Sequence, residues 1–122
     1  MKFPVIELVD RYTIAVVKHQ KTQGANQAEL DFYTAQMREL DIGLIQYEVA
    51  RLIQLHADIW AMEDDFKKCR LDGVDLAEIG QRALDIRDLN NSRVTIKNRI
   101  AELLKDPVRE IKQDHVSELK KV

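Results

Sequence analysis

Apolar residues recur along this chain three and four positions apart, the spacing that places side chains on one face of an α-helix. Near the start, the pattern runs through Val5, Val9, Tyr12 and Val16. Pro4 stands just before it, and proline is well suited to the first turn of a helix. The pattern therefore predicts a first helix over residues 4–20.

A glycine and a capping signal mark the start of a second helix. Gly24 interrupts the first apolar pattern, and Asn26 followed by Glu29 has the spacing of a capping box. The apolar row that begins there continues at helical spacing. A second helix is therefore expected over residues 26–41.

The apolar row shifts to another face of the helix near Gly43, and a shift of this kind indicates a break or a kink. We place that break near residues 41–44 and expect a third helix over residues 45–70. A turn at Leu71–Val74, which contains a glycine, follows it.

The fourth helix has signals at both ends. Asp75 with Glu78 three residues later is a second capping signal. The residue before a proline disfavours the helical conformation, so Pro107 ends the pattern. The sequence predicts a helix over residues 75–105, then a tail over residues 107–122 that forms a short or frayed helix.

The composition agrees with a helical protein. Of the 122 residues, 33% are charged and 6% are aromatic, with two prolines and four glycines, a balance typical of long amphipathic helices. The length fits one domain. We therefore predict a single all-α domain over residues 1–122, an antiparallel helical bundle built on a hairpin of the third and fourth helices.

Polar residues interrupt the apolar faces of these two long helices. On a helical wheel, Glu63 projects from the middle of the apolar face, beside Trp60. The polar residues that intrude into the apolar face of the fourth helix are Arg82, Asn90, Arg93 and Lys97.

The hairpin gives these residues a structural explanation. It would place Glu63 opposite Arg82, and His56 opposite Leu89 or Asn90. A carboxylate in an apolar face needs a partner to offset its desolvation, and a buried asparagine can fix helix register. We therefore expect a Glu63–Arg82 ion pair, and a loss of about 2 to 5 kcal/mol on Glu63→Ala. A functional site is the second explanation.

The segments "VIELVDRYTIAVVK", "LHADIWAMEDDFKKC" and "DLNNSRVTIKNRIAELL" resemble, in that order, an uncharacterised bacterial family of small helical proteins, a domain of unknown function. The resemblance covers about residues 5–105, and the chain departs from it at Tyr12, at "DIG" and in its tail. It implies a link to surface-polysaccharide and glycosyltransferase genes. The matching motif residues are Glu7, Leu8, Val9, Asp10 and Arg11, then Trp60, Glu63 and Asp64, then Asn90 and Arg93.

The helical wheels and the resemblance together indicate one polar cluster, either structural or functional. Its members are His56, Trp60, Glu63, Asp64, Arg82, Asn90, Arg93 and Lys97.

The sequence contains few of the residue patterns that are known from catalytic and metal-binding sites. No His-Glu-x-x-His motif accompanies His56, so no metal site is predicted, and scattered glycines form no phosphate loop. Helical nucleotide pyrophosphohydrolases bind magnesium through acids on paired helices, but "MEDDFKK" lacks their third acid. Asp85 and Asp88 offer one acid pair. We assign no catalytic residue and no cofactor.

Charge and cysteine content indicate which partners and which cellular compartment to expect. The net charge is −2, and bases alternate with acids along the chain, so a nucleic-acid partner is not expected. The single Cys69 excludes an internal disulfide. The start lacks the apolar core of a signal peptide, and no apolar run is long enough to span a membrane. These features predict a cytoplasmic protein.

The apolar faces of the long helices are wider than one hairpin can cover, which favours association as in coiled coils. We expect a homo-oligomer, most simply a homodimer, or binding of a protein partner. The predicted function is a non-enzymatic oligomeric interaction or accessory protein, linked by the resemblance to surface-polysaccharide biosynthesis. The alternative is a metal-dependent nucleotide pyrophosphohydrolase-like protein or a small-ligand-binding helical bundle.

Overall fold

The computed structural model describes residues 3–67 and 75–111, and within these ranges the chain forms helices and no strands. In order they are α1 (Val5–Lys21), α2 (Gln27–Met37), the short 3-10 helix η1 (Ile42–Leu44), α3 (Gln46–Lys67) and α4 (Leu76–Leu103). The predicted all-α fold class is confirmed. Cys69, the turn predicted at residues 71–74 and the tail beyond residue 111 lie outside the described residues.

The second helix is shorter than predicted. It ends at Met37 instead of residue 41, because residues 38–41 form turns that place Leu40 against the core. The break expected near residues 41–44 is present as η1. The chain thus changes direction between α2 and α3, as the shift in the apolar row indicated.

The capping signals have different outcomes. Asp75 caps α4, since its Oδ1 accepts a hydrogen bond of 2.8 Å from the Glu78 amide. Asn26 occupies the N-cap of α2, but its side chain caps nothing. Its Nδ2 donates instead to the Ala15 carbonyl of α1, at 3.0 Å, and to Glu29, at 3.2 Å. The predicted capping box is wrong because this amide joins α2 to α1.

The turn between α1 and α2 requires a glycine. Gly24 has a φ of 87°, in the left-handed region that glycine adopts without steric cost. Its amide donates to the His19 carbonyl at 2.9 Å, and a Cβ here would lie 3.3 Å from His19 Nε2. This turn sends α2 back along α1.

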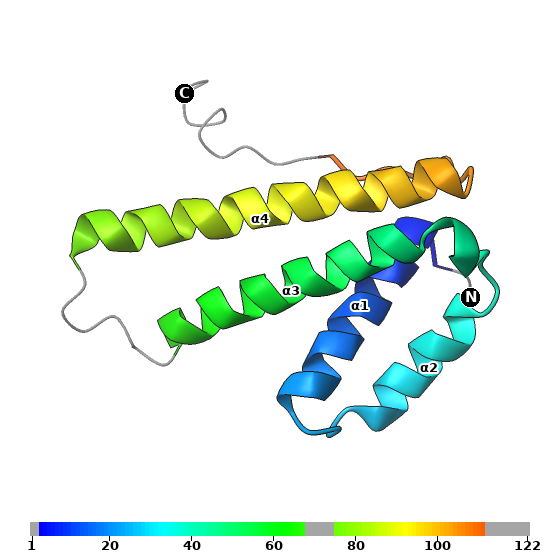
Figure 1. The fold of residues 1–122 in the computed structure, drawn as a ribbon, viewed down its shortest axis with the longest axis horizontal. Helices are drawn as coiled ribbons and strands as arrows, with labels where there is room; N and C mark the ends of the chain where they lie inside the picture. Colours follow the sequence, from blue (N-terminus) through cyan, green and yellow to red (C-terminus); the bar gives the residue numbers. More distant parts are fainter. Residues whose placement is uncertain (1–2, 68–74, 112–122) are drawn as a thin grey trace.

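The core lies at the end of the molecule where all the helices meet. The start of α1, the end of α2, the start of α3 and the end of α4 come together there (Figure 1). The buried residues of this core are Leu8, Val9, Met37, Ile45, Leu52 and Ile100.

The other ends of α3 and α4 extend beyond α1 and α2. The two long helices lie side by side with opposite chain directions, and α3 is the helix that covers the start of α4 (Figure 1). Leu76 and Leu84 on this part of α4 are 85% and 41% exposed. Among the described helices, none combines the length and apolar character needed to cross a membrane.

Candidate functional site

A carboxylate on α1, Asp10, binds side chains from both long helices. Its Oδ1 lies 3.0 Å from His56 Nε2 on α3 and 3.7 Å from Arg93 Nη1 on α4. Its Oδ2 lies 3.4 Å from Lys97 Nζ, one turn further along α4. Asp10 therefore ties α1 to α3 and α4 in the interior of the bundle.

This polar network is largely buried. The side chains of His56 and Lys97 are each 6% exposed, that of Asp10 is 16% exposed and that of Arg93 is 23% exposed. A lysine in such a position needs negative partners to offset the loss of hydration. Lys97 has them in Asp10 and in Glu110, which comes from beyond the end of α4.

Opposing influences set the pKa of Asp10. Burial alone would raise it, but the hydrogen bond from His56 and the charges of Arg93 and Lys97 have the larger combined effect. The pKa of Asp10 therefore lies below its ordinary value of 3.8. The carboxylate is ionised at neutral pH and can only accept hydrogen bonds, so His56 Nε2 must donate.

A hollow of about 400 Å³ opens beside this network, between α1, α3 and α4. We call it the Trp60 pocket. Its volume is in the range of small-molecule sites, and it combines an apolar wall with several polar groups. The lining residues are Ile14, Val17, His56, Ile59, Trp60, Glu63, Asp64, Asn90 and Arg93.

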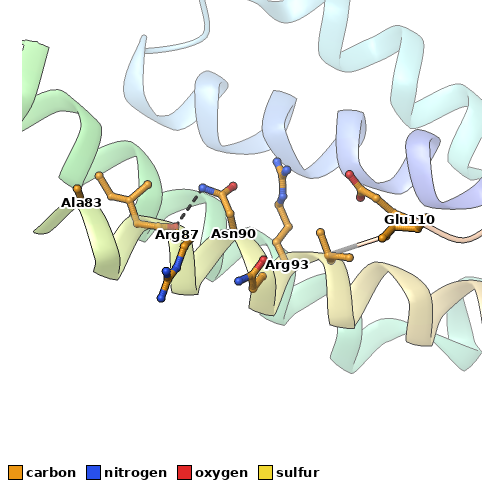
Figure 2. Close-up of a pocket in the computed structure, with 9 residues that line it drawn as sticks. Ala83, Arg87, Asn90, Arg93 and Glu110 are labelled. Atoms are coloured by element: carbon orange, nitrogen blue, oxygen red, sulfur yellow. Dashed lines mark hydrogen bonds between the residues drawn. The ribbon is translucent and has the colours of Figure 1, made fainter. Parts of the chain in front are cut away.

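A second hollow, of about 380 Å³, lies along α4 and shares Asn90 and Arg93 with the Trp60 pocket. Figure 2 shows these two side chains pointing from α4 toward α1, whereas Arg87 points the other way. Asn90 Nδ2 donates to the Ile86 carbonyl one turn earlier, at 3.1 Å. Asn90 therefore does not bind across the helix seam in the way predicted for a register-fixing residue.

The chain after α4 folds back onto it, and we call residues 106–111 the return segment. Asn98 holds this segment with its side-chain amide, which accepts from the Glu110 amide at 2.8 Å and donates to the Glu110 carbonyl at 2.7 Å. The Glu110 carboxylate also binds Lys97. The return segment thus completes the charge network behind the Trp60 pocket.

The structure brings most of the predicted polar cluster together. The members that line the Trp60 pocket are His56, Trp60, Glu63, Asp64, Asn90 and Arg93. Lys97 joins them indirectly, because it shares Asp10 with His56 and Arg93.

Arg82 does not belong to this group, and the expected Glu63–Arg82 ion pair is wrong. Arg82 binds Glu78 on its own helix at 3.3 Å, while Glu63 is exposed and makes no ion pair with the described part of the chain. Glu63 lies at the rim of the Trp60 pocket, and its side chain is exposed to solvent. Its carboxylate is hydrated and needs no buried partner.

Asp10 and Glu110 belong to the network but were not among the residues predicted for the polar cluster. Asp10 was named only as part of a motif, although Ile6, Asp10, Thr13 and Val17 share one face of α1 at helical spacing. A helical wheel of that segment would have found a carboxylate among buried residues. Glu110 gave no such signal, because it follows Pro107 in a segment without helical structure.

Comparison with known proteins identified no relative of this chain. No family model, no curated protein and no solved structure matches the chain. The resemblance to a family of unknown function stays a prediction. Among the residues that the structure describes, no three histidine, cysteine or acidic side chains are grouped so that they could hold a metal ion.

Proposed function

We propose that this protein is a non-enzymatic, small-ligand-binding helical bundle and that the Trp60 pocket is its binding site. The observation that supports this proposal is the convergence of side chains from α1, α3 and α4 on one hollow of about 400 Å³. Pockets for small molecules typically have an apolar lining with a few placed polar groups. A cytoplasmic location is part of the proposal.

The pocket offers contacts of both kinds. Ile14, Val17 and Ile59 form an apolar wall, and Trp60 adds an aromatic ring that is only partly buried. A flat or ring-shaped ligand can pack its face against such a surface. His56 on α3 and both Asn90 and Arg93 on α4 provide polar atoms, which would orient the bound molecule.

A thermal-shift screen tests this proposal. The probes are aromatic and alicyclic fragments, nucleotides, sugar nucleotides and divalent metals, with sugar nucleotides included because of the predicted link to polysaccharide genes. A ligand present at about one hundred times its Kd stabilises the folded protein by about 2.7 kcal/mol. We therefore expect a rise in Tm of several degrees for at least one fragment class.

Substitutions assign any hit to the pocket. We expect Trp60→Ala to abolish the rise in Tm, because the aromatic wall is lost. Tyr47→Ala is the matched control, since Tyr47 is an aromatic residue of the same helix that is 71% exposed outside the pocket. A screen without hits, or hits that Trp60→Ala leaves unchanged, would contradict the proposal.

Exposed apolar residues on α4 favour a second function, that of an oligomeric interaction or accessory protein. Leu76 and Leu84 are two turns apart on the part of α4 that projects beyond α1 and α2 (Figure 1). A second copy of the chain would bury this face. We expect a dimer by light scattering at micromolar concentration and a monomer for Leu84→Glu, with Phe32→Glu on α2 as the control. A strict monomer at that concentration would argue against this function.

A further inference from the structure

The two ring nitrogens of His56 have different surroundings. Nε2 lies 3.0 Å from Asp10 Oδ1, while Nδ1 makes no hydrogen bond with any part of the chain that the structure describes. The side chain is 6% exposed and lines the Trp60 pocket. A ring nitrogen without a protein partner, on a side chain that forms part of a pocket wall, is available to a bound molecule.

The four charged side chains of the Asp10 network balance one another without a charge on the His56 ring. Asp10 on α1 and Glu110 of the return segment carry negative charge, and Arg93 and Lys97 on α4 carry positive charge. Glu63 and Asp64, on α3 with His56, lie at the pocket. A third buried cation beside Arg93 and Lys97 would have to share the Asp10 carboxylate with them, at a cost in desolvation. The neutral ring completes the network without that cost.

We propose that Asp10 sets the hydrogen-bonding polarity of the pocket through His56 and thereby selects the chemical class of the ligand. Asp10 accepts from Nε2–H and so fixes one neutral tautomer, in which Nδ1 is an acceptor. The ligand is then a ring compound that presents a hydroxyl or N–H group to Nδ1 while its face packs on Trp60. This inference rests on the proposed ligand-binding function.

Other groups at the pocket agree with this ligand class. Nδ2 of Asn90 donates to Ile86 in its own helix, which leaves Oδ1 of the same amide as a second acceptor. The carboxylate of Glu63 at the rim is a third acceptor, whereas Arg93 adds a positively charged donor to the lining. The acceptors therefore favour molecules that are rich in hydrogen-bond donors.

Asp10→Asn is the informative substitution because the introduced amide has a defined orientation. Lys97 and Arg93 can only donate, and Lys97 is the nearer of the two, at 3.4 Å from Oδ2 against 3.7 Å from Oδ1 for Arg93. The amide oxygen should therefore take the side of Lys97. The amide nitrogen then faces His56 and donates to Nε2. The ring must move its proton to Nδ1, which turns the pocket nitrogen from an acceptor into a donor. Asp10 is thus a positioning residue that acts on the ligand through His56.

Nitrogen NMR of the His56 side chain tests the tautomer without any ligand. In the wild-type protein at neutral pH we expect the Nε2–H tautomer, and in Asp10→Asn the Nδ1–H tautomer. Asp31→Asn is the matched control, since Asp31 is an exposed aspartate of α2 that accepts a hydrogen bond from Gln27. It should leave the tautomer unchanged. An Nδ1–H tautomer in the wild type would overturn the inference, even if Asp10→Asn fails to fold.

Matched fragments test the ligand class. Indole and 4-ethylphenol carry a donor, whereas 1-methylindole and 4-ethylanisole have almost the same shape without it, and quinoline presents an acceptor. One neutral hydrogen bond corresponds to a preference of about threefold to tenfold. We expect the wild type to prefer the donor fragments by this factor in NMR titrations, and Asp10→Asn to prefer quinoline.

The outcomes separate this inference from the function on which it rests. If no fragment binds at millimolar concentration, the proposed pocket function fails, and the ligand class fails with it. If fragments bind with affinities that depend on Trp60 but not on a donor group, the pocket is retained and the inference is overturned. Equal preferences in the wild type and in a folded Asp10→Asn protein would also overturn it.

Discussion

At the scale of single residues, two carboxylates differ in burial and therefore in their expected contribution to stability. Asp10 lies among His56, Arg93 and Lys97 in the interior of the bundle, whereas Glu63 stands at an exposed rim. Electrostatic interactions are stronger where water is excluded and are screened where it is present. Asp10 should therefore matter for stability, and Glu63 should not.

Truncation of each carboxylate measures this difference. We expect Asp10→Ala to lower the free energy of unfolding by about 3 kcal/mol, because it leaves His56 and Arg93 without their partner while Lys97 keeps Glu110. Glu63→Ala should change it by no more than about 0.5 kcal/mol. Urea denaturation of the two variants tests the prediction. A larger loss of stability for Glu63→Ala than for Asp10→Ala would contradict this prediction and would support the buried Glu63 ion pair that the sequence predicted.

The lowered pKa of Asp10 predicts a pH dependence of stability. In the unfolded chain Asp10 has its ordinary pKa of 3.8, above its folded value, so the unfolded state takes up the proton first. The stability contributed by the Asp10 carboxylate is thus present above pH 3.8 and is lost as the pH falls through the folded pKa.

Denaturation at a series of acidic pH values tests that dependence. Asp10→Asn has no carboxylate to protonate, so its stability should fall less steeply than that of the wild type below pH 3.8. Glu29 also has a lowered pKa, owing to hydrogen bonds from Asn26 and Lys18, and its share of the slope should remain in the variant. Identical slopes for the two proteins would contradict the assignment to Asp10.

At the scale of elements, the return segment depends on α4 for its position. Residues 106–111 have no helical hydrogen bonds of their own, and Asn98 holds Glu110 by its backbone. Because a side-chain amide can donate and accept at once, it can bind an extended backbone as a neighbouring strand would. The segment in turn brings the Glu110 carboxylate to Lys97.

Asn98→Ala should release this segment while leaving α4 intact. We expect the amide hydrogen of Glu110 to lose its protection from exchange, and the protein to lose about 1 to 2 kcal/mol of stability with the two hydrogen bonds. Ser92→Ala, at an exposed position of α4, is the control. Continued protection of the Glu110 amide in Asn98→Ala would show that other contacts hold the segment.

At the scale of the whole molecule, the bundle has two unequal ends. All the helices pack together at the core end, whereas the start of α4 extends past α1 and α2 with α3 beside it (Figure 1). Fewer apolar contacts cover this projecting part, and local opening is easiest where such contacts are few. The Trp60 pocket lies between these ends, where the side chains of α1 still reach both long helices.

Hydrogen exchange along α4 should follow this difference in the monomer. Amides from residue 94 to residue 101, where Val94, Lys97, Ile100 and Ala101 are buried, should exchange more slowly than amides from residue 79 to residue 86. Exchange measured by NMR at low protein concentration tests this prediction, and the slow region of α4 serves as the internal control. Uniform protection in a protein shown to be monomeric would contradict it.

The sequence was most informative where local chemistry acts within one helix. Within residues 3–67 and 75–111, the spacing of apolar residues located α1, α2, α3 and α4, and the shift at Gly43 located η1. It was least informative for partners across helices. The predicted hairpin paired Glu63 with Arg82, but Glu63 is exposed to water and Arg82 binds Glu78. Asp10 lies on α1, and its partners on α3 and α4 are distant from it in the sequence.

The sequence by itself therefore determined that the chain is helical, where its helices lie and which polar residues interrupt their apolar faces. Helical periodicity and capping act over a few residues, so these features are visible in a single stretch of chain. The tertiary structure alone decided that Asp10, on α1, is the shared partner of His56, Arg93 and Lys97, and that Glu110 returns to Lys97. Which charges meet depends on how far α1 extends along α3 and α4 and on where water is excluded, and neither is encoded in local spacing.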